Sequence, residues 1–424
     1  MFRLLILTIL SFPLYAGSLN IEVEAEEAIL LNGKTGKVLF EKNGYEPAFP
    51  ASTTKMATAL YALHLVDDPS SITFVADQDS IASITPQAKK QSLYRSPPHW
   101  LETDGTHMSI KLGEEIPLID LLYGSLVGSA NDASNVLAKN LGGTIPKFME
   151  DLNQFLKTLG CENTYFLNPH GLHHPSHVSS PYDLALIAKK GLENPLFREI
   201  VSTSRYSCPQ TNLEEERTIV QSNLLLRPSS PFYMESAIGV KTGNTQAAGK
   251  NLVAAIETDD RMLIGVLLGV RDTRAAVYQQ MQKMFAAATQ EKKMRRTLLP
   301  PGVTNLTTKV PGGRKKLKTY LPHGFVYDYY PSEETEVQAS VVWNFPLLPI
   351  AQNAQVGTLR LSDPEGNLVS ETPLLTSEPI SPTLLTQATH YGREGGAIWF
   401  FLALAAAILL FFVWLFRTRN RPRR

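Results

Sequence analysis

The sequence contains few cysteines and no excess of charge of either sign. Cys161 and Cys208 are the only cysteines among 424 residues. The sequence does not show whether they meet, so a disulfide and two buried thiols both stay open, and neither residue is assigned a function. Lysine and arginine together number 40, as do aspartate and glutamate. A protein that binds phosphates needs a basic excess, so nucleic acid is not an expected partner.

Both ends of the chain carry apolar runs of the kind found in targeting or membrane segments. Arg3 precedes a largely apolar stretch, residues 4–14, and Ala16 follows it. This order is typical of a secretory signal peptide, which we predict at residues 1–16. The stretch is too short to span a bilayer comfortably. A buried N-terminal strand is the alternative interpretation.

The second apolar run, residues 397–416, carries no charged side chain. Its length matches the hydrocarbon core of a bilayer, so we predict a transmembrane helix. Five arginines follow within residues 417–424. By the positive-inside rule, this basic tail is cytoplasmic and everything before the helix lies outside the cytoplasm. The sequence therefore predicts a single-pass protein of the cytoplasmic membrane.

The first large region, residues 21–296, mixes helical and strand patterns. Apolar segments at 28–31 and 38–41 flank turn residues and predict a hairpin. Helical patterns fill the middle of the region, and residues 87–107, polar and without period, are interpreted as a long loop. Three strand patterns follow at residues 238–242, 251–257 and 262–270, and then an amphipathic helix. This order predicts an α+β domain in which helices are layered on an antiparallel sheet.

The second region is predicted to be a small all-β domain over residues 302–376. Residues 298–301, Leu-Leu-Pro-Pro, are interpreted as the linker that precedes it. Residues 335–341 alternate polar and apolar side chains, which indicates a half-buried strand. Residues 377–396 contain two prolines and are interpreted as a stalk that leads to the membrane.

Three short motifs occur in order along the chain: Ser52-Thr-Thr-Lys55, Ser129-Ala-Asn131 and Lys241-Thr242-Gly243. Each motif is weak alone, and a second Lys-Thr-Gly at residues 34–36 is interpreted only as a turn. Their order and context make the set informative. Ser52 enters an apolar helix, and Lys55 is on the same face at position i+3.

The residue types of these motifs suit nucleophilic catalysis. A serine needs a base to remove its proton, and a lysine serves as that base only when it is neutral. Desolvation or a nearby positive charge, which Lys241 would supply, favours the neutral lysine. Lys241 and Thr242 on a strand can bind a carboxylate, and Gly243 is expected to let the substrate backbone approach closely.

Four segments carry a resemblance to a known family: 49–56 (Phe-Pro-Ala-Ser-Thr-Thr-Lys-Met), 128–133 (Gly-Ser-Ala-Asn-Asp-Ala), 168–172 (Asn-Pro-His-Gly-Leu) and 239–252, which begins Gly-Val-Lys-Thr-Gly-Asn. Together they resemble low-molecular-mass penicillin-binding proteins of the D-alanyl-D-alanine carboxypeptidase family. The resemblance implies the penicillin-binding, serine β-lactamase-like fold. It also implies that the chain removes the terminal D-alanine from peptidoglycan stem peptides and is acylated by β-lactams, at the periplasmic side of the bacterial inner membrane.

The resemblance also implies residue roles. Ser52 would be the nucleophile and Lys55 the general base. Ser129 and Asn131 would relay protons and hold the peptide, while Lys241 and Thr242 would bind its terminal carboxylate. The backbone N–H groups of Ser52 and Asn244 would form the oxyanion hole. This chemistry requires no cofactor and no metal.

Three features depart from the family pattern. His173 stands where the family usually has aspartate, residues 87–107 form a longer loop, and the predicted anchor spans the membrane instead of lying on it. These departures concern loop contacts and substrate range.

Three other interpretations fit the sequence less well. A serine β-lactamase of class A has glutamate four residues before an asparagine, but Thr164 stands four residues before Asn168. A non-catalytic wall-binding scaffold would not need all three motifs. The histidines at positions 170, 173, 174 and 177 suggest zinc, but Gly171 and Pro175 interrupt any helix that would align them.

Overall fold

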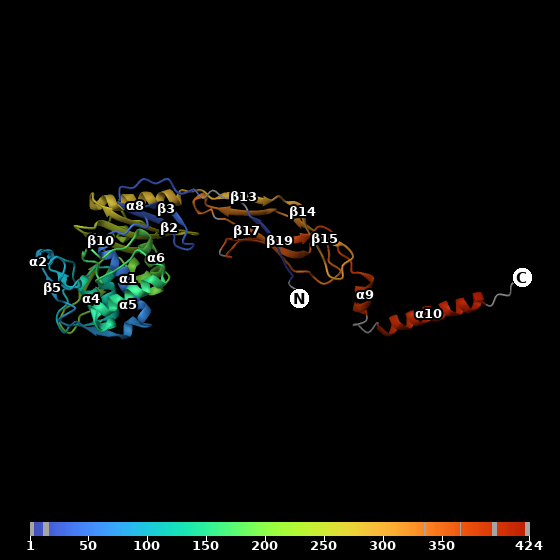
Figure 1. The fold of residues 1–424 in the computed structure, drawn as a ribbon, viewed down its shortest axis with the longest axis horizontal. Helices are drawn as coiled ribbons and strands as arrows, with labels where there is room; N and C mark the ends of the chain where they lie inside the picture. The colour runs from blue at the N-terminus through green and yellow to red at the C-terminus, as the bar shows by residue number, and fades with distance from the viewer. Residues whose placement is uncertain (1–3, 12–16, 335, 365, 392–396, 420–424) are drawn as a thin grey trace. The chain divides into compact units, whose positions relative to one another are not determined.

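The computed structural model describes residues 4–11, 17–334, 336–364, 366–391 and 397–419. The chain forms two compact units. One comprises Gly17–Glu291, and the other comprises Met1–Ala16 together with Lys292–Arg424 (Figure 1). Each unit has its own core and is described separately.

The first unit is built on a five-stranded antiparallel sheet with the order β10-β11-β12-β2-β3. Its strands are β2 (Glu27–Asn32), β3 (Val38–Lys42), β10 (Ala237–Thr245), β11 (Gly249–Glu257) and β12 (Met262–Val270). The predicted hairpin and three late strands are confirmed. Ala28 of β2 pairs with Leu267 of β12, so the two ends of the unit meet in the sheet.

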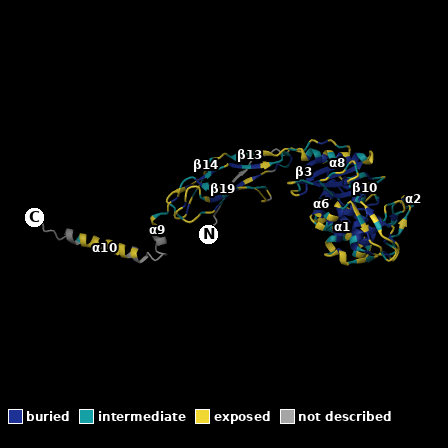
Figure 2. Ribbon diagram, turned by 180° about the vertical axis from the view of Figure 1, so that it is seen from behind, coloured by how far each residue is buried: buried dark blue, intermediate teal, exposed yellow. Residues whose placement is uncertain are grey.

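The sheet is covered on both faces. Because side chains alternate along a strand, β12 divides its own between two cores: Ile264, Val266 and Leu268 belong to one, and Leu263 and Leu267 to the other. The first core also contains residues of α1 (Lys55–Leu65), α3 (Leu118–Leu126), α4 (Asn131–Gly142), α5 (Ile145–Thr158), α6 (Pro181–Leu192) and α7 (Pro195–Ser202). The second contains residues of α8 (Arg274–Thr289), and the predicted α+β layering is confirmed (Figure 2).

Helix α1 is the central helix of the first core. Residues 55–62 are all buried, so no polar face is left for solvent, as expected for a helix enclosed by its neighbours. A short 3-10 turn, Ala51–Thr54, precedes it. The predicted helix from residue 52 therefore begins as a tighter turn, which holds Ser52 at the end of a buried and rigid element.

The prediction that residues 87–107 form a long loop is wrong in part. Helix α2 (Pro86–Gln91) extends into this region, and β6 (Leu101–Glu102) lies within it and pairs in parallel with β5 (Ser83–Ile84). Thr85 caps α2 by accepting a hydrogen bond from Ala88 N, and Pro86 occupies the first helical position. This Thr-Pro start is a standard N-terminal signal. Residues 86–102 are therefore ordered by this helix cap and by the pairing of β5 with β6.

The second unit contains a six-stranded sheet with the order β1-β17-β18-β19-β15-β14 and a separate β13-β16 pair. The bounds are β1 (Leu4–Ser11), β13 (Met294–Leu299), β14 (Gly302–Lys309), β15 (Lys316–Leu321), β16 (Phe325–Tyr329), β17 (Gln338–Trp343), β18 (Gln355–Ser362) and β19 (Leu368–Thr376). Leu298 and Leu299 belong to β13, so they are not part of a linker. Ile380, placed by sequence in the stalk, is fully buried in this core because it bridges Ile350.

The two predicted membrane-related segments both fall in this unit. Leu4–Ser11, within the predicted signal peptide, forms β1 and pairs with β17; residues 1–3 and 12–16 lie outside the described residues. Residues 397–416 form most of α10 (Ala397–Arg419), and α9 (Leu384–Tyr391) lies within the predicted stalk. Among the described residues, no helix meets the length and hydropathy of a membrane span, so the structure does not support the predicted transmembrane helix.

Candidate active site

The candidate nucleophile and base lie at the start of α1. The fully buried Lys55 Nζ lies 2.9 Å from Ser52 Oγ, and it also donates to Asn131 Oδ1 at 2.7 Å and to the carbonyl oxygen of His170 at 2.6 Å. Three oxygens from three chain segments therefore fix the amine beside the serine. The sequence predicted the pair with Ser52, but the role of the His170 carbonyl was missed.

Burial controls the protonation of Lys55. Removing the ammonium group from water lowers its pKa well below the ordinary lysine value, and the positive charge of Lys241 lowers it further. The carboxylate of Asp132 acts in the opposite direction. Since a neutral amine is the form that accepts a proton, the surroundings prepare Lys55 to act as a base.

Lys241 of the third motif contacts Ser129 of the second motif. Lys241 Nζ, fully buried on β10, donates to Ser129 Oγ at 2.9 Å and to the carbonyl oxygen of Thr242 at 3.1 Å. Burial lowers the pKa of Lys241 to about 7. Ser129 lies between α3 and α4 with a φ of 63°, and Ala51 beside the nucleophile has a φ of 50°. Both residues adopt the left-handed region, a costly conformation that is often found at functional sites.

Two glycines let backbone segments approach the nucleophile. A Cβ on Gly243 would lie 2.8 Å from the carbonyl oxygen of Pro50 and 3.2 Å from Ser52 N. A Cβ on Gly171, whose φ is +88°, would lie 1.9 Å from the carbonyl oxygen of Ala51. Gly243 also lines a cavity at Ser52, so the structure adds a packing reason to the expected room for substrate backbone: the strand itself packs against the turn of Ser52.

Two cavities meet at Ser52, and both are also lined by Thr106 and Asn244. The cavity of about 380 Å³ is lined by Ser129, Thr242 and Gly243, and in addition by Ser222, Lys250 and Arg274. Ser222 Oγ lies 2.8 Å from Thr242 Oγ1, and Arg274 donates to the Ser222 carbonyl oxygen at 3.0 Å. Lys250 lies within the segment 239–252 that carries the family resemblance, but it was not assigned to the site. No short motif marks Ser222 or Arg274, so the sequence did not reveal them.

The cavity of about 610 Å³ lies between the first motif and the ordered segment that contains α2. It is lined by residues of that segment, including Lys90 and Tyr94, and by His173, Asn244 and Gln246. Seven of its seventeen lining residues lie within 87–107. The segment that was predicted as a long loop therefore forms part of the candidate site.

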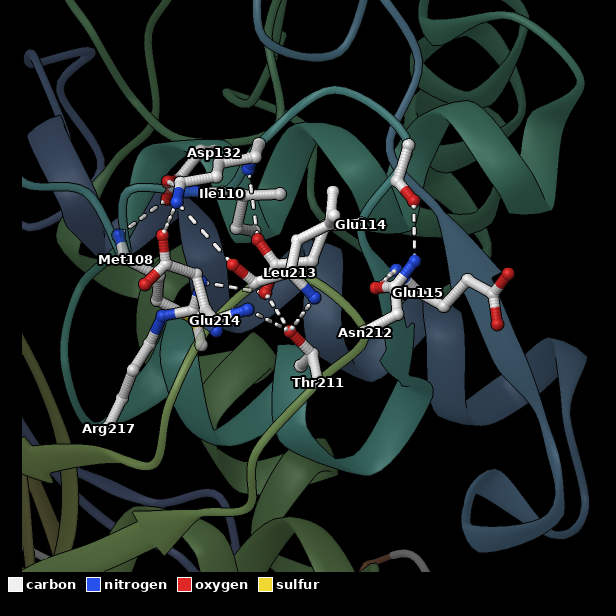
Figure 3. A network of polar contacts seen from close by, with 12 residues as sticks. Met108, Ile110, Glu114, Glu115, Asp132, Thr211, Asn212, Leu213, Glu214 and Arg217 are labelled. Atoms are coloured by element: carbon white, nitrogen blue, oxygen red, sulfur yellow. Dashed lines mark hydrogen bonds and ion pairs between the residues drawn. The ribbon is translucent and has the colours of Figure 1, made fainter.

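A polar network joins Asp132, in the first turn of α4, to residues 108–115, and joins these in turn to residues 211–217 (Figure 3). Asp132, next to Asn131, accepts hydrogen bonds from Met108 N at 2.9 Å and Ile110 N at 3.0 Å. Glu114, fully buried, forms an ion pair with Arg217 at 2.7 Å. Its second oxygen accepts from Lys111 N at 2.9 Å. The network ties the segment after Thr106 to the hairpin of β8 (Arg205–Cys208) and β9 (Arg217–Val220).

The histidines that suggested zinc are engaged in other contacts. His170 Nε2 contacts the His99 carbonyl oxygen at 3.1 Å, and both ring nitrogens of His177 are bonded, to Thr54 Oγ1 and to Leu167 N. His174 Nδ1 accepts from Ser176 N at 3.0 Å. In the part of the chain that the structure describes, no group of three or more His, Cys, Asp or Glu is arranged to hold a metal.

The side chain of Thr164 makes hydrogen bonds within the protein, and both cysteines are buried. Thr164 Oγ1 donates to Asp183 Oδ2 at 2.7 Å and contacts Ser179 Oγ, so this side chain is committed away from Ser52. Cys161 and Cys208 are free and buried, so the disulfide left open by the sequence is not formed. Burial raises the pKa of Cys161 to about 12, which keeps the thiol protonated and inert.

Comparison with known proteins decides the family. Residues 15–272 match the family model described as D-alanyl-D-alanine carboxypeptidase. The chain belongs to this family. D-alanyl-D-alanine carboxypeptidase DacF of Bacillus subtilis is 28% identical over 359 residues, which cover 84% of this chain and 85% of that protein.

Solved structures agree with the family assignment. A D-alanyl-D-alanine carboxypeptidase of Mycobacterium tuberculosis is 28% identical, with a TM-score of 0.55 over 66% of this chain and 97% of that one. Penicillin binding protein 6B of Escherichia coli shares the fold with a TM-score of 0.58 at 24% identity, over 85% of this chain and 98% of that one. The chain is therefore a serine-type peptidase of this family with a penicillin-binding fold.

We expect Gly171→Ala to slow D-alanine release from a D-Ala-D-Ala peptide about tenfold or more. The added methyl group would overlap the carbonyl oxygen of Ala51 and displace the turn that carries Ser52. A tenfold loss corresponds to about 1.4 kcal/mol in barrier height. Steady-state kinetics of the purified variant measure the effect.

The matched control is Gly36→Ala. Gly36 also has a positive φ, +78°, but a Cβ there meets no atom within 4 Å. This variant bears only the backbone strain, so its D-alanine release should be unchanged while its stability falls by about 1 kcal/mol. A folded Gly171→Ala protein with the wild-type rate would contradict the packing argument.

Proposed function

We propose that Ser52 attacks the carbonyl carbon of the penultimate D-alanine in a peptidoglycan stem peptide and releases the terminal D-alanine. The observation that carries the proposal is the distance of 2.9 Å between Lys55 Nζ and Ser52 Oγ, combined with burial that favours the neutral amine. Lys55 takes the serine proton as the new ester bond forms. The amide nitrogen of the leaving D-alanine receives a proton when its bond breaks.

Ser129 and Lys241 act on the leaving-group side of the scissile bond. Their contact at 2.9 Å supports a proton relay through Ser129 to the departing amine. Lys241 and Thr242 bind the terminal carboxylate of the substrate in the smaller cavity, where Ser222 supports Thr242. Asn131, held by Lys55, orients the peptide from the opposite wall.

The backbone N–H groups of Ser52 and Asn244 form the oxyanion hole. The proposal is supported by the close packing of Gly243 on the Ser52 turn, because it brings the end of β10 beside the nucleophile. Such donors stabilise the negative charge that develops on the carbonyl oxygen. Water then hydrolyses the acyl-enzyme ester, which releases the shortened peptide and restores Ser52.

β-Lactams are expected to acylate the same serine. Opening of the lactam ring leaves the leaving group tethered, where it blocks the approach of water to the ester. A β-lactamase of class A overcomes this block with an added glutamate. Here the corresponding Thr164 is hydrogen-bonded to Asp183, so we infer a long-lived penicillin adduct and inhibition of the enzyme.

We expect Ser52→Ala to abolish both D-alanine release and labelling by a fluorescent penicillin, while the fold is retained. The substitution removes the atom that forms the ester, a loss that typically costs many orders of magnitude in rate. Ser176→Ala, at an exposed serine, is the control and should behave as wild type. An active or labelled Ser52→Ala enzyme would disprove the assignment of the nucleophile.

A second prediction concerns the pH profile of penicillin acylation. The rate should rise with pH as Lys55 loses its proton, and the positive charge of Lys241 lowers the pKa of Lys55. Lys241→Gln removes that charge, so the pKa of Lys55 rises and the acid limb of the profile should move to higher pH. Rapid-quench measurement of acylation rates between pH 5 and pH 10 follows the limb.

Lys250→Gln is the control for this shift. Lys250 lines the smaller cavity but is not among the groups that perturb Lys55. Its acid limb should stay at the wild-type pH. An acid limb of Lys241→Gln that stays in place, or moves to lower pH, would contradict the coupling of the two lysines.

We propose that residues 1–16 direct export and that residues 397–416 attach the enzyme to the membrane, with the catalytic unit in the periplasm. Both proposals rest on the sequence pattern, and large apolar side chains such as Trp399 and Phe411 are exposed on α10. Mass spectrometry of protein recovered from cells should show an N-terminus near residue 17. A variant that ends at Tyr391, which keeps the buried Ile380, should move from the membrane to the soluble fraction. Recovery of both forms in the soluble fraction would refute the anchor.

A further inference from the structure

The two cavities beside Ser52 can be assigned to the two parts of the substrate, on the basis of the proposed function. The smaller cavity contains Thr242 next to Lys241 and so takes the leaving D-alanine with its carboxylate. The scissile bond lies at Ser52, where the cavities meet. The larger cavity, about 610 Å³, must therefore receive the acyl part of the peptide, including the residue that precedes D-Ala-D-Ala.

The charged groups of the larger cavity include two lysines and two carboxylates: Lys89, Lys90, Glu102 and Asp104. Their formal charges cancel, so the cavity has no strong field of one sign. Lys89 is buried and forms an ion pair with Glu102 at 2.8 Å, which neutralises both groups. Selectivity therefore depends on the two charges that remain, those of Lys90 and Asp104.

Lys90 lines the cavity from α2, whereas Asp104 lines it from the turn that follows β6. Lys90 Nζ donates to Gln246 Oε1 at 3.4 Å, a contact that joins α2 to the turn after β10. Within the described ranges of the chain, the exposed Asp104 makes no hydrogen bond and no ion pair. It is the one carboxylate of this cavity, among the residues described, that is free to bind a cation.

The residues that follow Asp104 in the sequence contact the centre of the site. The next residue, Gly105, packs so tightly on Asn131 that a Cβ would lie 2.8 Å from its side-chain nitrogen. Thr106 follows and lines both cavities. Asp104 is thus directly adjacent to the segment that touches the centre of the site, whereas Lys90 lies on α2.

The wall that carries these groups is held in place by aromatic contacts. The ring of Tyr94 packs edge-on against His173 at 5.5 Å and against His174 at 5.8 Å. His173 in turn packs against Phe49, three residues before the nucleophile, at 4.6 Å. The segment that contains α2 is therefore packed, through these rings, against the turn of Ser52. Such packing gives the fixed geometry that a specificity pocket requires.

We propose that the larger cavity binds the side chain of the residue before D-Ala-D-Ala, and that Asp104 selects a side chain that ends in an ammonium group. An ammonium group that reaches Asp104 gains an ionic hydrogen bond with a carboxylate that otherwise has only water. A side chain of the same length without the charge gains none. Asp104 is a specificity-determining residue and takes no part in bond making.

Two synthetic peptides that differ only in this charge test the proposal. One is Nα-acetyl-L-lysyl-D-Ala-D-Ala, and the other carries a second acetyl group on the lysine Nε. With the full-length wild-type enzyme at pH 7, kcat/KM for D-alanine release should be about fivefold higher for the free amine, as for an ion pair between partly exposed groups. Asp104→Asn should reduce this ratio to about one, mainly by lowering kcat/KM for the free amine.

Asp259→Asn is the matched control, because Asp259 is an exposed aspartate in the turn between β11 and β12. It should keep the wild-type ratio. Equal rates for the two peptides with the wild-type enzyme, a preference for the acetylated peptide, or an equal loss on both peptides in Asp104→Asn would each overturn the proposal. Release of D-alanine from neither peptide, with Ser52 unreactive to penicillin, would instead overturn the proposed function itself.

Discussion

The site depends on one buried amine. Lys55 reaches Ser52, Asn131 and the carbonyl of His170, so a single side chain connects three segments that are far apart in the sequence. A buried lysine that lost these oxygens would carry a large desolvation cost. The same contacts that satisfy Lys55 therefore also fix the geometry of the nucleophile, and stability and reactivity share one set of atoms.

Much of the site was predictable because its residues lie in short motifs with local physical meaning. The i, i+3 spacing of Ser52 and Lys55, and the strand position of Lys241, could be read without a structure. Other contributions could not, since they are made by backbone or by packing. The carbonyl of His170 carries no signal in the residue type, and Gly171 is identifiable only when its neighbour Ala51 is known.

The fold shows the same division. The hairpin, the three late strands and the central helices follow hydrophobic period, and the structure confirms them. Residues 87–107 were misjudged because their order comes from tertiary contacts: Lys89 is buried by its pairing with Glu102, and Tyr94 packs on two histidines of a distant segment. The helix start at Thr85-Pro86 is a local signal that the prediction for this region did not use.

The pairing of β2 with β12 has a consequence for the synthesis and folding of the enzyme. Ala28 cannot find Leu267 until nearly the whole catalytic unit has been synthesised, and β10, which carries Lys241, joins the sheet only through β11 and β12. Contacts of such long sequence separation slow folding, because a large loop must close before they form. A partly made or partly folded chain has Ser52 and Lys55 close in sequence but lacks the burial and the second lysine that activate them. The reactivity of Ser52 therefore requires the complete sheet, and an incompletely folded molecule is not acylated.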